Sequence, residues 1–322
     1  MTIVTVTLSP ALDVCTSVPH IEPERKLHCT GAEMSPGGGG VNVARAVHRL
    51  GGVATAVFPW GGTTGALLCE LLRGEGVPVR PVAATGITRE DFAVTELTTG
   101  RQYRFVLPGP ALSAAERERC VEAMLDGLTA GSTVVLSGSL PDGVEPIQLA
   151  AMAWVAKQRG ARVIVDTTGP ALGDAARGGA YLLKPSVNEL RIHVGHELTT
   201  DEEIADAGRE LLAAGPNHAV LVSLAAKGAL LVRADEPAVR ISPPAVRALS
   251  AIGAGDSLVG GLVRALERGD DLVEAARVGV AAGTAATISS GHGLCRPADV
   301  DRILPDVATR SLAVLTGSGD RR

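Results

Sequence analysis

Aromatic side chains are scarce in this chain of 322 residues, since Phe, Trp and Tyr together make up only 2% of it. Lysine is almost as rare and occurs four times. Acidic residues outnumber basic ones by 35 to 30, which gives a net charge of −5, and no stretch of the chain concentrates Lys and Arg. Nucleic-acid-binding surfaces usually combine a basic patch with rings that stack on bases. The composition therefore argues against a nucleic-acid partner.

Cysteine pairs at metal-binding or redox spacing are also missing. The five cysteines are scattered, and no two form a Cys-x-x-Cys motif: Cys15, Cys29, Cys69, Cys120 and Cys295. An odd number without such spacing fits a reducing cytosol better than a disulfide framework or a structural zinc site. The N-terminus lacks a basic leader, and the most apolar run, 219–232, is interrupted by Lys227 and Gly228. We therefore expect a cytoplasmic protein without a membrane segment.

Apolar runs alternate with helical patterns along most of the chain. Strand-like runs lie at 3–8, 53–58, 77–82, 134–136, 163–165 and 219–222, and helical spacing occurs at 64–73, 114–128, 146–158, 201–213, 255–267 and 271–287. This alternation predicts an α/β fold with a doubly wound, mostly parallel sheet flanked by helices. Ligands of such sheets bind beyond the carboxyl ends of strands. Asp13, Ser139 and Ser223 follow or end predicted strands and are candidates for such contacts.

Two segments interrupt this alternation. Apolar and polar residues alternate loosely over residues 15–35, without helical spacing. The stretch 88–107, with approximate bounds, resembles a hairpin with a turn at Gly100. We expect the two segments to pair into one small sheet that forms a lid. Residues 1–310 would then make a single domain, and the Gly-rich, polar residues 311–322 a flexible tail.

A turn of small residues, Gly253-Ala254-Gly255-Asp256, opens an amphipathic helix. The first turn of a helix has unpaired backbone N–H groups and partial positive charge, so it attracts an anion. A carboxylate in the same turn suits phosphoryl transfer, in which the amides hold the migrating group and Asp256 takes the proton of the attacking hydroxyl. The alternative is that Asp256 only caps the helix.

A second glycine turn, residues 37–40, opens another helix. It is neither a Gly-x-Gly-x-x-Gly motif nor a Walker loop, because no Gly-Lys-Ser/Thr follows. A ligand can lie on the backbone of Gly38 and Gly39, and Asn42 in the first helical turn can point toward it. The alternative is a flexible linker. For Asp13, likewise, the alternative to a ligand contact is a solvated loop aspartate.

Taken together, these residues resemble the two signatures of the phosphofructokinase-B (ribokinase-like) carbohydrate kinases. Residues 38–42 resemble the first signature, and Ser250 to Asp256 with Gly260 and Gly261 resemble the second. The resemblance covers nearly the whole chain, and two distant signatures in the right order are highly specific. It implies a ribokinase-like sheet with a small β-sheet lid that often also joins two subunits into a homodimer. It further implies ATP, Mg²⁺ and a sugar hydroxyl as acceptor.

The resemblance also assigns roles to matching residues. Asp256 would be the base, and the anion hole would be formed by the amides of Gly253, Ala254 and Gly255. The sugar would be bound by Asp13, Gly38, Gly39, Asn42 and Ser139. The nucleotide would be contacted by Lys184, Ser186, Ser223 and Gly228. Glu189 would act on Mg²⁺ through water, and Ser250 and Ile252 would mark a site for a monovalent cation such as K⁺.

Several positions depart from the family pattern. The Asn-x-x-Glu magnesium motif begins with Ser186 here, a usual Gly in the nucleotide loop is Ala225, and a usual Thr before the anion hole is Ala251. These changes leave the water network around the metal open and favour weaker nucleotide or cation binding. They also leave room for another class of function, a catalytically weak sensor of sugar phosphates or nucleotides.

Basic residues gather on the predicted lid. Lys26, Arg89 and Arg104 would suit a dianionic phosphate, which arginines bind with two parallel hydrogen bonds. The alternative is that they are solvated surface charges. We therefore predict an ATP-dependent kinase of a sugar phosphate, with fructose 6-phosphate as the first choice. Kinases of fructose 1-phosphate and tagatose 6-phosphate share most of the motifs and remain alternatives.

Overall fold

The computed structural model describes residues 2–289 and 293–312. Within them, the centre of the molecule is a ten-stranded sheet with seven neighbouring parallel strands. In spatial order these are β11 (Ala219–Ser223), β10 (Leu182–Leu183), β9 (Arg162–Asp166), β8 (Thr133–Ser137), β1 (Ile3–Val6), β4 (Ala54–Trp60) and β5 (Val79–Ala83). The predicted doubly wound, mostly parallel sheet is confirmed.

Three antiparallel strands extend the sheet beyond β11, and they were not predicted from the sequence. They are β12 (Ala229–Val232), β13 (Val239–Ser242) and β14 (Ala308–Ser311). Lys227 and Gly228 interrupt the apolar run because a tight turn there joins β11 to β12 as a hairpin. Leu312 N donates a hydrogen bond to Ala238 O at 2.8 Å, so pairing continues past the expected boundary at 310. The rest of the expected tail, 313–322, lies outside the described residues.

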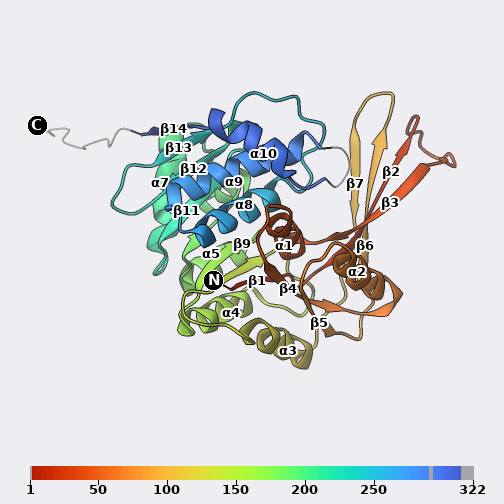
Figure 1. Ribbon diagram of the computed structural model, residues 1–322, viewed down its shortest axis with the longest axis horizontal. Coiled ribbons are helices and arrows are strands. Elements are labelled where there is room, and N and C mark those ends of the chain that lie inside the picture. Colours follow the sequence, from red (N-terminus) through yellow and green to blue (C-terminus); the bar gives the residue numbers. More distant parts are fainter. Residues whose placement is uncertain (1, 290–292, 313–322) are drawn as a thin grey trace, which may run out of the picture.

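Helices cover both faces of the sheet (Figure 1). One face packs against α1 (Gly39–Arg49), α2 (Gly62–Gly74), α8 (Ala254–Arg268), α9 (Leu272–Thr287) and α10 (Pro297–Ile303). The other packs against α3 (Ala114–Leu125), α4 (Pro146–Gln158), α5 (Ala171–Gly178), α6 (Val187–Val194) and α7 (Asp201–Ala213). No helix in the described part of the chain is long and apolar enough to cross a membrane.

Helix α8 lies unusually close to its neighbours because it presents glycine to them. A Cβ on Gly260 would lie 2.5 Å from Cβ of Ala46 in α1, and one on Gly261 would lie 2.7 Å from Cβ of Ala282 in α9. Real Cβ atoms do not approach this closely, so only glycine permits the contact. The close packing fixes the N-terminus of α8 beside the first turn of α1.

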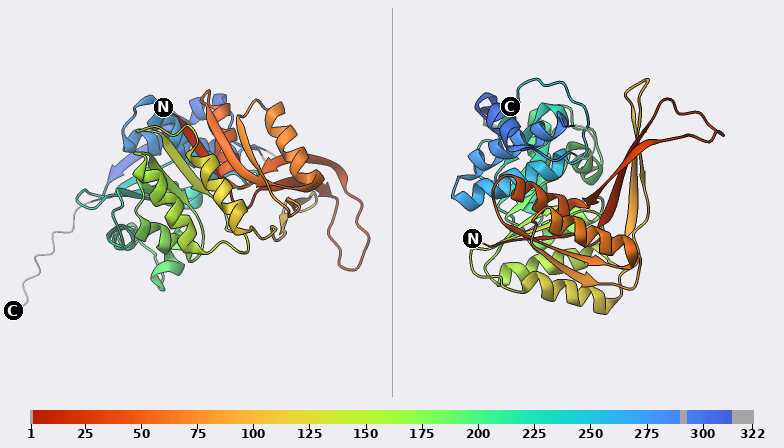
Figure 2. Two further views of the ribbon diagram at one scale, coloured as in Figure 1. Left: turned by 90° about the horizontal axis from the view of Figure 1, so that it is seen from below. Right: turned by 45° about the vertical axis from the view of Figure 1, so that its right-hand side comes forward.

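The lid is a separate four-stranded sheet, in the order β3 (Thr30–Gly37), β2 (Ala11–Val18), β6 (Arg89–Glu96) and β7 (Gln102–Val106). Strands β2 and β6 pair in parallel and each carries its own antiparallel partner. Figures 1 and 2 show the lid projecting from one side of the main body. The predicted second sheet is confirmed, although it begins at Ala11 and not near residue 15.

Candidate active site

A cavity of about 290 Å³ lies where the lid joins the main sheet. Strand β1 sits between β4 and β8, so the chain winds outward from it in both directions, and such switch points hold the ligands of open α/β sheets. The cavity is lined by residues that follow β8 and β9, by lid residues and by the first turns of α1 and α8: Asp13, Gly38, Gly39, Asn42, Arg89, Asp91, Arg104, Ser137, Gly138, Ser139, Asp166, Thr168, Ala251, Ile252, Gly253, Gly255 and Asp256.

Asp256 lies in the first turn of α8 but does not cap it. The N-cap residue is Gly253, whose φ of 72° is left-handed, and the helix has no side-chain cap. The carboxylate is turned to Asn42, whose Nδ2 donates a hydrogen bond to Oδ2 of Asp256 at 2.9 Å. The capping alternative is therefore wrong. Gly253 and Gly255 line the cavity at this helix N-terminus, whereas Ala254 N donates to the carbonyl oxygen of Ala251 at 3.4 Å.

A chain of buried polar contacts orients the Asn42 amide. Arg45 donates from Nη1 to Oδ1 of Asn42 at 3.1 Å and to the carbonyl oxygen of Pro36 at 2.6 Å. Its Nε and Nη2 donate to the two carboxylate oxygens of Glu75 at 2.7 and 2.6 Å. Because Arg45 can only donate, Oδ1 must face it, and Nδ2 is left to face Asp256. We call this set, Glu75, Arg45 and Asn42, the orienting chain.

Burial sets the proton affinity of Asp256. It raises the pKa of this carboxyl to about 6, with a further rise from the charge of Asp166, while the hydrogen bond from Asn42 opposes the shift. A general base works best when its pKa lies near the operating pH. With this pKa, Asp256 is ionised at neutral pH and holds a proton more readily than an ordinary aspartate.

Lys184 places a fixed cation among these carboxylates. Its Nζ lies 3.0 Å from Oδ1 of Asp166, and both side chains are largely withdrawn from solvent. Burial alone would lower the pKa of Lys184, but the charges of Asp166, Glu189 and Asp256 outweigh it and raise that pKa. Lys184 therefore stays protonated and offsets part of the negative charge of the site.

Residues of the lid also form part of the wall of this cavity. Asp13 lies buried on β2, which rules out the solvated loop aspartate, and a Cβ on Gly37 would lie 2.4 Å from its carboxyl group. Burial, and next the charge of Asp91, raise the pKa of Asp13 to about 7. Arg89 donates from Nη1 to Asp91 Oδ1 at 2.9 Å. The buried Nε of Arg89 has no hydrogen-bond partner within the described residues.

Only two of the three predicted phosphate ligands meet at the cavity. Arg89 and Arg104 line it, whereas Lys26 does not. Lys26 is exposed in the connection between β2 and β3, which projects away from the main body (Figure 1). The hairpin is too long for its far end to face the site at its root. Asp91, Arg45, Glu75 and Asp166 were not among the predicted site residues.

The residues predicted for the nucleotide lie together at the ends of β10 and β11. Ser186 and Ser223 form a β-bridge. Ser186 caps α6, because its Oγ accepts from Glu189 N at 3.2 Å while its own N donates to Oε2 of Glu189 at 2.7 Å. Gly228 has a φ of 89°, and Ala225 adopts a φ of 51°, which is strained for a residue with a Cβ. None of these residues lines the cavity described above.

The predicted monovalent-cation loop is tied to the lid. Ser250 Oγ lies 3.3 Å from Oε1 of Gln102 on β7 and donates a hydrogen bond to it. The same Oγ accepts from Ile252 N at 3.2 Å. Ile252 and Ala251 line the cavity beside the first turn of α8. The loop is therefore held between the lid and the N-terminus of α8.

Comparison with known proteins identifies the class to which this fold and site belong. Residues 8–299 match the pfkB family of carbohydrate kinases, and the chain belongs to this family. It is 44% identical over 302 residues to the ATP-dependent 6-phosphofructokinase isozyme 2 of Escherichia coli, covering 94% of this chain and 97% of that protein. It is 33% identical over 311 residues to the 1-phosphofructokinase of Rhodobacter capsulatus, covering 96% and 98%.

Solved structures of the Escherichia coli phosphofructokinase-2 share the whole fold. They include a complex with fructose 6-phosphate, a complex with potassium and a tetrameric inhibited form. Their TM-scores to this chain are 0.89, 0.90 and 0.89, each at 43% sequence identity, and each covers 94% of this chain and 98% of the other.

Proposed function

We propose that this protein is an ATP-dependent 6-phosphofructokinase that phosphorylates the 1-hydroxyl of fructose 6-phosphate in the cytoplasm. The observation that carries the proposal is one cavity joining Asp256, at an anion-binding helix N-terminus, to Arg89 and Arg104 of the lid. A phosphate docked on the two arginines leaves the far end of the sugar toward Asp256. The higher identity to the 6-phosphofructokinase than to the 1-phosphofructokinase supports the same acceptor.

In the proposed reaction, Asp256 accepts the proton of the 1-hydroxyl while the oxygen of this hydroxyl attacks the γ-phosphorus of ATP. The new O–P bond forms while the bond from the γ-phosphorus to the bridging oxygen breaks, which leaves ADP. The amides of Gly253, Ala254 and Gly255 stabilise the negative charge on the migrating group. Asn42 fixes the carboxylate of Asp256 by donating a hydrogen bond to its Oδ2.

The acceptor is tested by measuring kcat/KM for fructose, fructose 6-phosphate, fructose 1-phosphate and tagatose 6-phosphate in the parent and in Arg104→Ala. One lost charge-assisted hydrogen bond should lower kcat/KM by roughly 10 to 100-fold for phosphorylated sugars. Free fructose should be nearly unaffected. Arg101→Ala is the matched control, because Arg101 is an exposed lid arginine that does not line the cavity.

The outcomes separate the alternatives. A parent that prefers free fructose would refute phosphate docking on the lid, and a preference for fructose 1-phosphate would keep the docking site but reverse the sugar. Saturable binding of fructose 6-phosphate without turnover would indicate the catalytically weak sensor.

We propose Mg²⁺ as the metal of the nucleotide. Within the described residues, no group of three His, Cys, Asp or Glu side chains could hold a metal ion by itself. This arrangement fits Mg²⁺, which keeps several waters and is bound mainly by substrate phosphates with one or two carboxylates. Glu189, beside Lys184 and Asp166, would supply such a carboxylate through water. The bound ion would neutralise charge on the nucleotide phosphates.

Glu189→Gln should raise the Mg²⁺ concentration needed for half-maximal turnover, because a neutral amide attracts the hydrated cation less. Glu189 also completes a capping box, and so does Glu203 in α7, which is remote from the cavity. Glu203→Gln is therefore the control for a simple loss of the cap. If Mg²⁺ titrations of Glu189→Gln superimpose on those of the parent, the metal role is wrong.

We further propose that the lid joins two copies into a homodimer and that Ser250 and Ile252 lie at a K⁺ site. Large apolar side chains on the lid are more than one-third exposed, as an interface would require: Leu27, Met34, Phe105, Val106 and Leu107. The complex of the Escherichia coli relative with potassium supports the cation. Its tetrameric form shows that the relative self-associates, without specifying the lid.

A further inference from the structure

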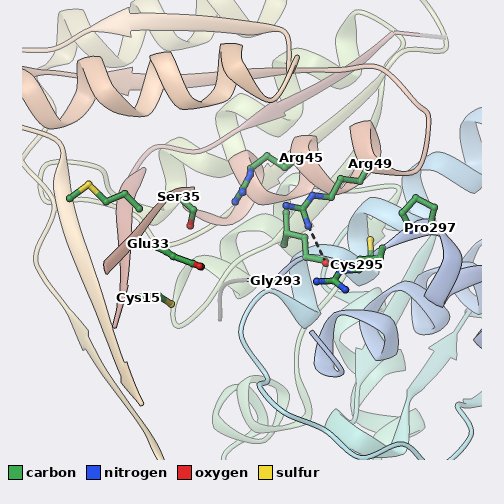
Figure 3. A pocket seen from close by; sticks show the side chains of 11 residues that line it. Cys15, Glu33, Ser35, Arg45, Arg49, Gly293, Cys295 and Pro297 are labelled. Atoms are coloured by element: carbon green, nitrogen blue, oxygen red, sulfur yellow. Dashed lines mark hydrogen bonds between the residues drawn. The ribbon is translucent and has the colours of Figure 1, made fainter. Parts of the chain in front are cut away.

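A second and larger cavity, of about 460 Å³, lies between lid strand β3 and the main body. Figure 3 shows Arg45 and Arg49 of α1 on one side of it, and Ser35 and Glu33 of β3 on the lid side. Arg296, just before α10, completes a set of three arginines. The cavity shares no lining residue with the candidate active site.

Within the described part of the chain, two of the three arginines have no carboxylate at ion-pair distance. Glu75 occupies Arg45, whereas neither Arg49 nor Arg296 lies within 4 Å of a carboxylate among residues 2–289 and 293–312. Arg49 donates from Nη1 to the carbonyl oxygen of Leu294 at 3.2 Å. Burial first, and then the charge of Arg45, lower the pKa of Arg49; the charge of Glu75 opposes this shift, and Arg296 adds to it. Like charges are thus crowded here in a protein whose net charge is negative.

The lid wall presents one unsatisfied polar group and one opposing charge. Ser35 Oγ is buried and has no hydrogen-bond partner among the described residues. Buried polar atoms are nearly always paired, so an unpaired one suggests a missing ligand or water. Glu33 is the acidic side chain that lines the cavity, and it is exposed on the rim. Its charge opposes an anion, but among the described residues it forms no ion pair with Arg49 or Arg296.

We propose that this cavity binds a small phosphate monoester, with the phosphate between Arg49 and Arg296 and its polar remainder toward Ser35. Guanidinium groups match phosphate oxygens in geometry and bind them through charge-assisted hydrogen bonds. The volume lies within the range of small-molecule sites, about 300 to 1,000 Å³. The bound anion relieves the repulsion among the arginines.

Such a ligand touches the catalytic machinery through one side chain. Arg45 lines this cavity and also orients Asn42, which holds Asp256. Its Nη1 also binds the carbonyl oxygen of Pro36 on β3. The ligand therefore links the lid, the orienting chain and the body. This makes the cavity a regulatory site for the lid and the base.

Binding is tested by calorimetric titration of the full chain with glycerol 3-phosphate and, separately, with inorganic phosphate. All variants carry Arg104→Ala, so that anion binding at the candidate active site, where Arg89 remains, is weakened. Arg296→Ala and Arg49→Ala should each weaken binding by about 10-fold or more, as expected for a charge-assisted hydrogen bond. Glu33→Gln should tighten it by about 2 to 5-fold, because an exposed like charge is removed.

Arg302→Ala is the matched control, since Arg302 lies on α10 but pairs with Asp299 and does not line the cavity. It should leave the Kd unchanged. Arg296 is exposed, so its removal leaves the folded protein intact for the titration. An unchanged Kd in both Arg49→Ala and Arg296→Ala, or binding that disappears with Arg104→Ala alone, would overturn the site. These titrations do not depend on catalysis and are independent of the proposed kinase activity.

Discussion

Asp256→Asn is expected to lower turnover by at least about 100-fold, as loss of a general base typically does. Asparagine keeps the shape of the side chain but cannot accept the proton of the acceptor hydroxyl. In the parent, kcat should fall as the pH drops below about 6, because the pKa of Asp256 is raised to about 6. Steady-state rates from pH 5 to 9 test both statements, and near-normal turnover in the variant would remove Asp256 from the mechanism.

The same substitution should stabilise the free protein at higher pH. The pKa of Asp256 is about 6 in the folded chain and 3.8 as its ordinary value, so the folded state favours the protonated form. The protonated carboxyl of Asp256 stabilises the folded state relative to the ionised carboxylate. This stabilisation is complete below pH 4 and is lost as the pH rises through 6. Asp256→Asn stays neutral throughout and should gain up to roughly 3 kcal/mol over the parent above that pH. Denaturant unfolding at pH 4 and pH 8 distinguishes this from general damage.

Arg45→Met is expected to damage both stability and the reaction. Arg45 is only 3% exposed and forms a bidentate pair with Glu75, which is 31% exposed. Breaking a buried pair costs about 3 to 5 kcal/mol, and we expect the lower end because Glu75 retains some solvent. Without Arg45 the Asn42 amide can rotate and turn its oxygen toward Asp256. The pKa of Asp256 should then rise, and kcat at pH 6 to 7 should fall by about 10-fold or more.

A double-mutant cycle separates orientation from folding. Once Asn42→Ala has removed the amide, Arg45→Met should have little further effect on the pH profile of kcat, because the two residues act in series. Arg264→Met is the control, since Arg264 is a partly buried arginine paired with Glu267 away from the cavity. Arg264→Met should lower the stability of the protein without shifting the acidic side of the pH profile of kcat. Additive effects of Arg45→Met and Asn42→Ala on the acidic side of this pH profile would refute the orienting chain.

Local patterns predicted the parts of the site that arise from local structure. Gly253 to Asp256 opens a helix because glycine permits the left-handed turn before α8, and Gly38 precedes α1 in a different conformation, with a φ of 102°, that also favours glycine. Strand ends placed Ser139 and Ser223 at one edge of the sheet. Each of these positions depends on contacts with near neighbours in the chain.

Other features depend on distant contacts and left little trace in the sequence. Arg45 was missed because its partner Glu75 lies 30 residues away, and the bond from Asn42 to Asp256 spans 214 residues. Asp13 was placed in a loop because the sequence did not reveal that the lid begins at Ala11. Lys26 was expected beside Arg89 and Arg104 but does not line the cavity with them. Hydrophobic periodicity does not predict how far a hairpin projects from the body. Strands β12 to β14 were missed because each is only four residues long, too short for a clear pattern of its own.

The pairing of β2 with β6 places the predicted sugar-selecting residues of the lid apart from the predicted catalytic residues of the main body. Ala11 and Arg89 are neighbours at the base of the lid, and the groups that would select the sugar follow on these two strands. Asn42, Lys184 and Asp256, which would carry the chemistry, belong to the main body. Selection can therefore alter the choice of acceptor by changing residues 11–37 and 89–106 while the phosphoryl-transfer apparatus stays the same. We expect that exchanging these segments between members of the family would shift the acceptor preference, while the sugar contacts predicted for Gly38, Gly39, Asn42 and Ser139 would stay with the main body.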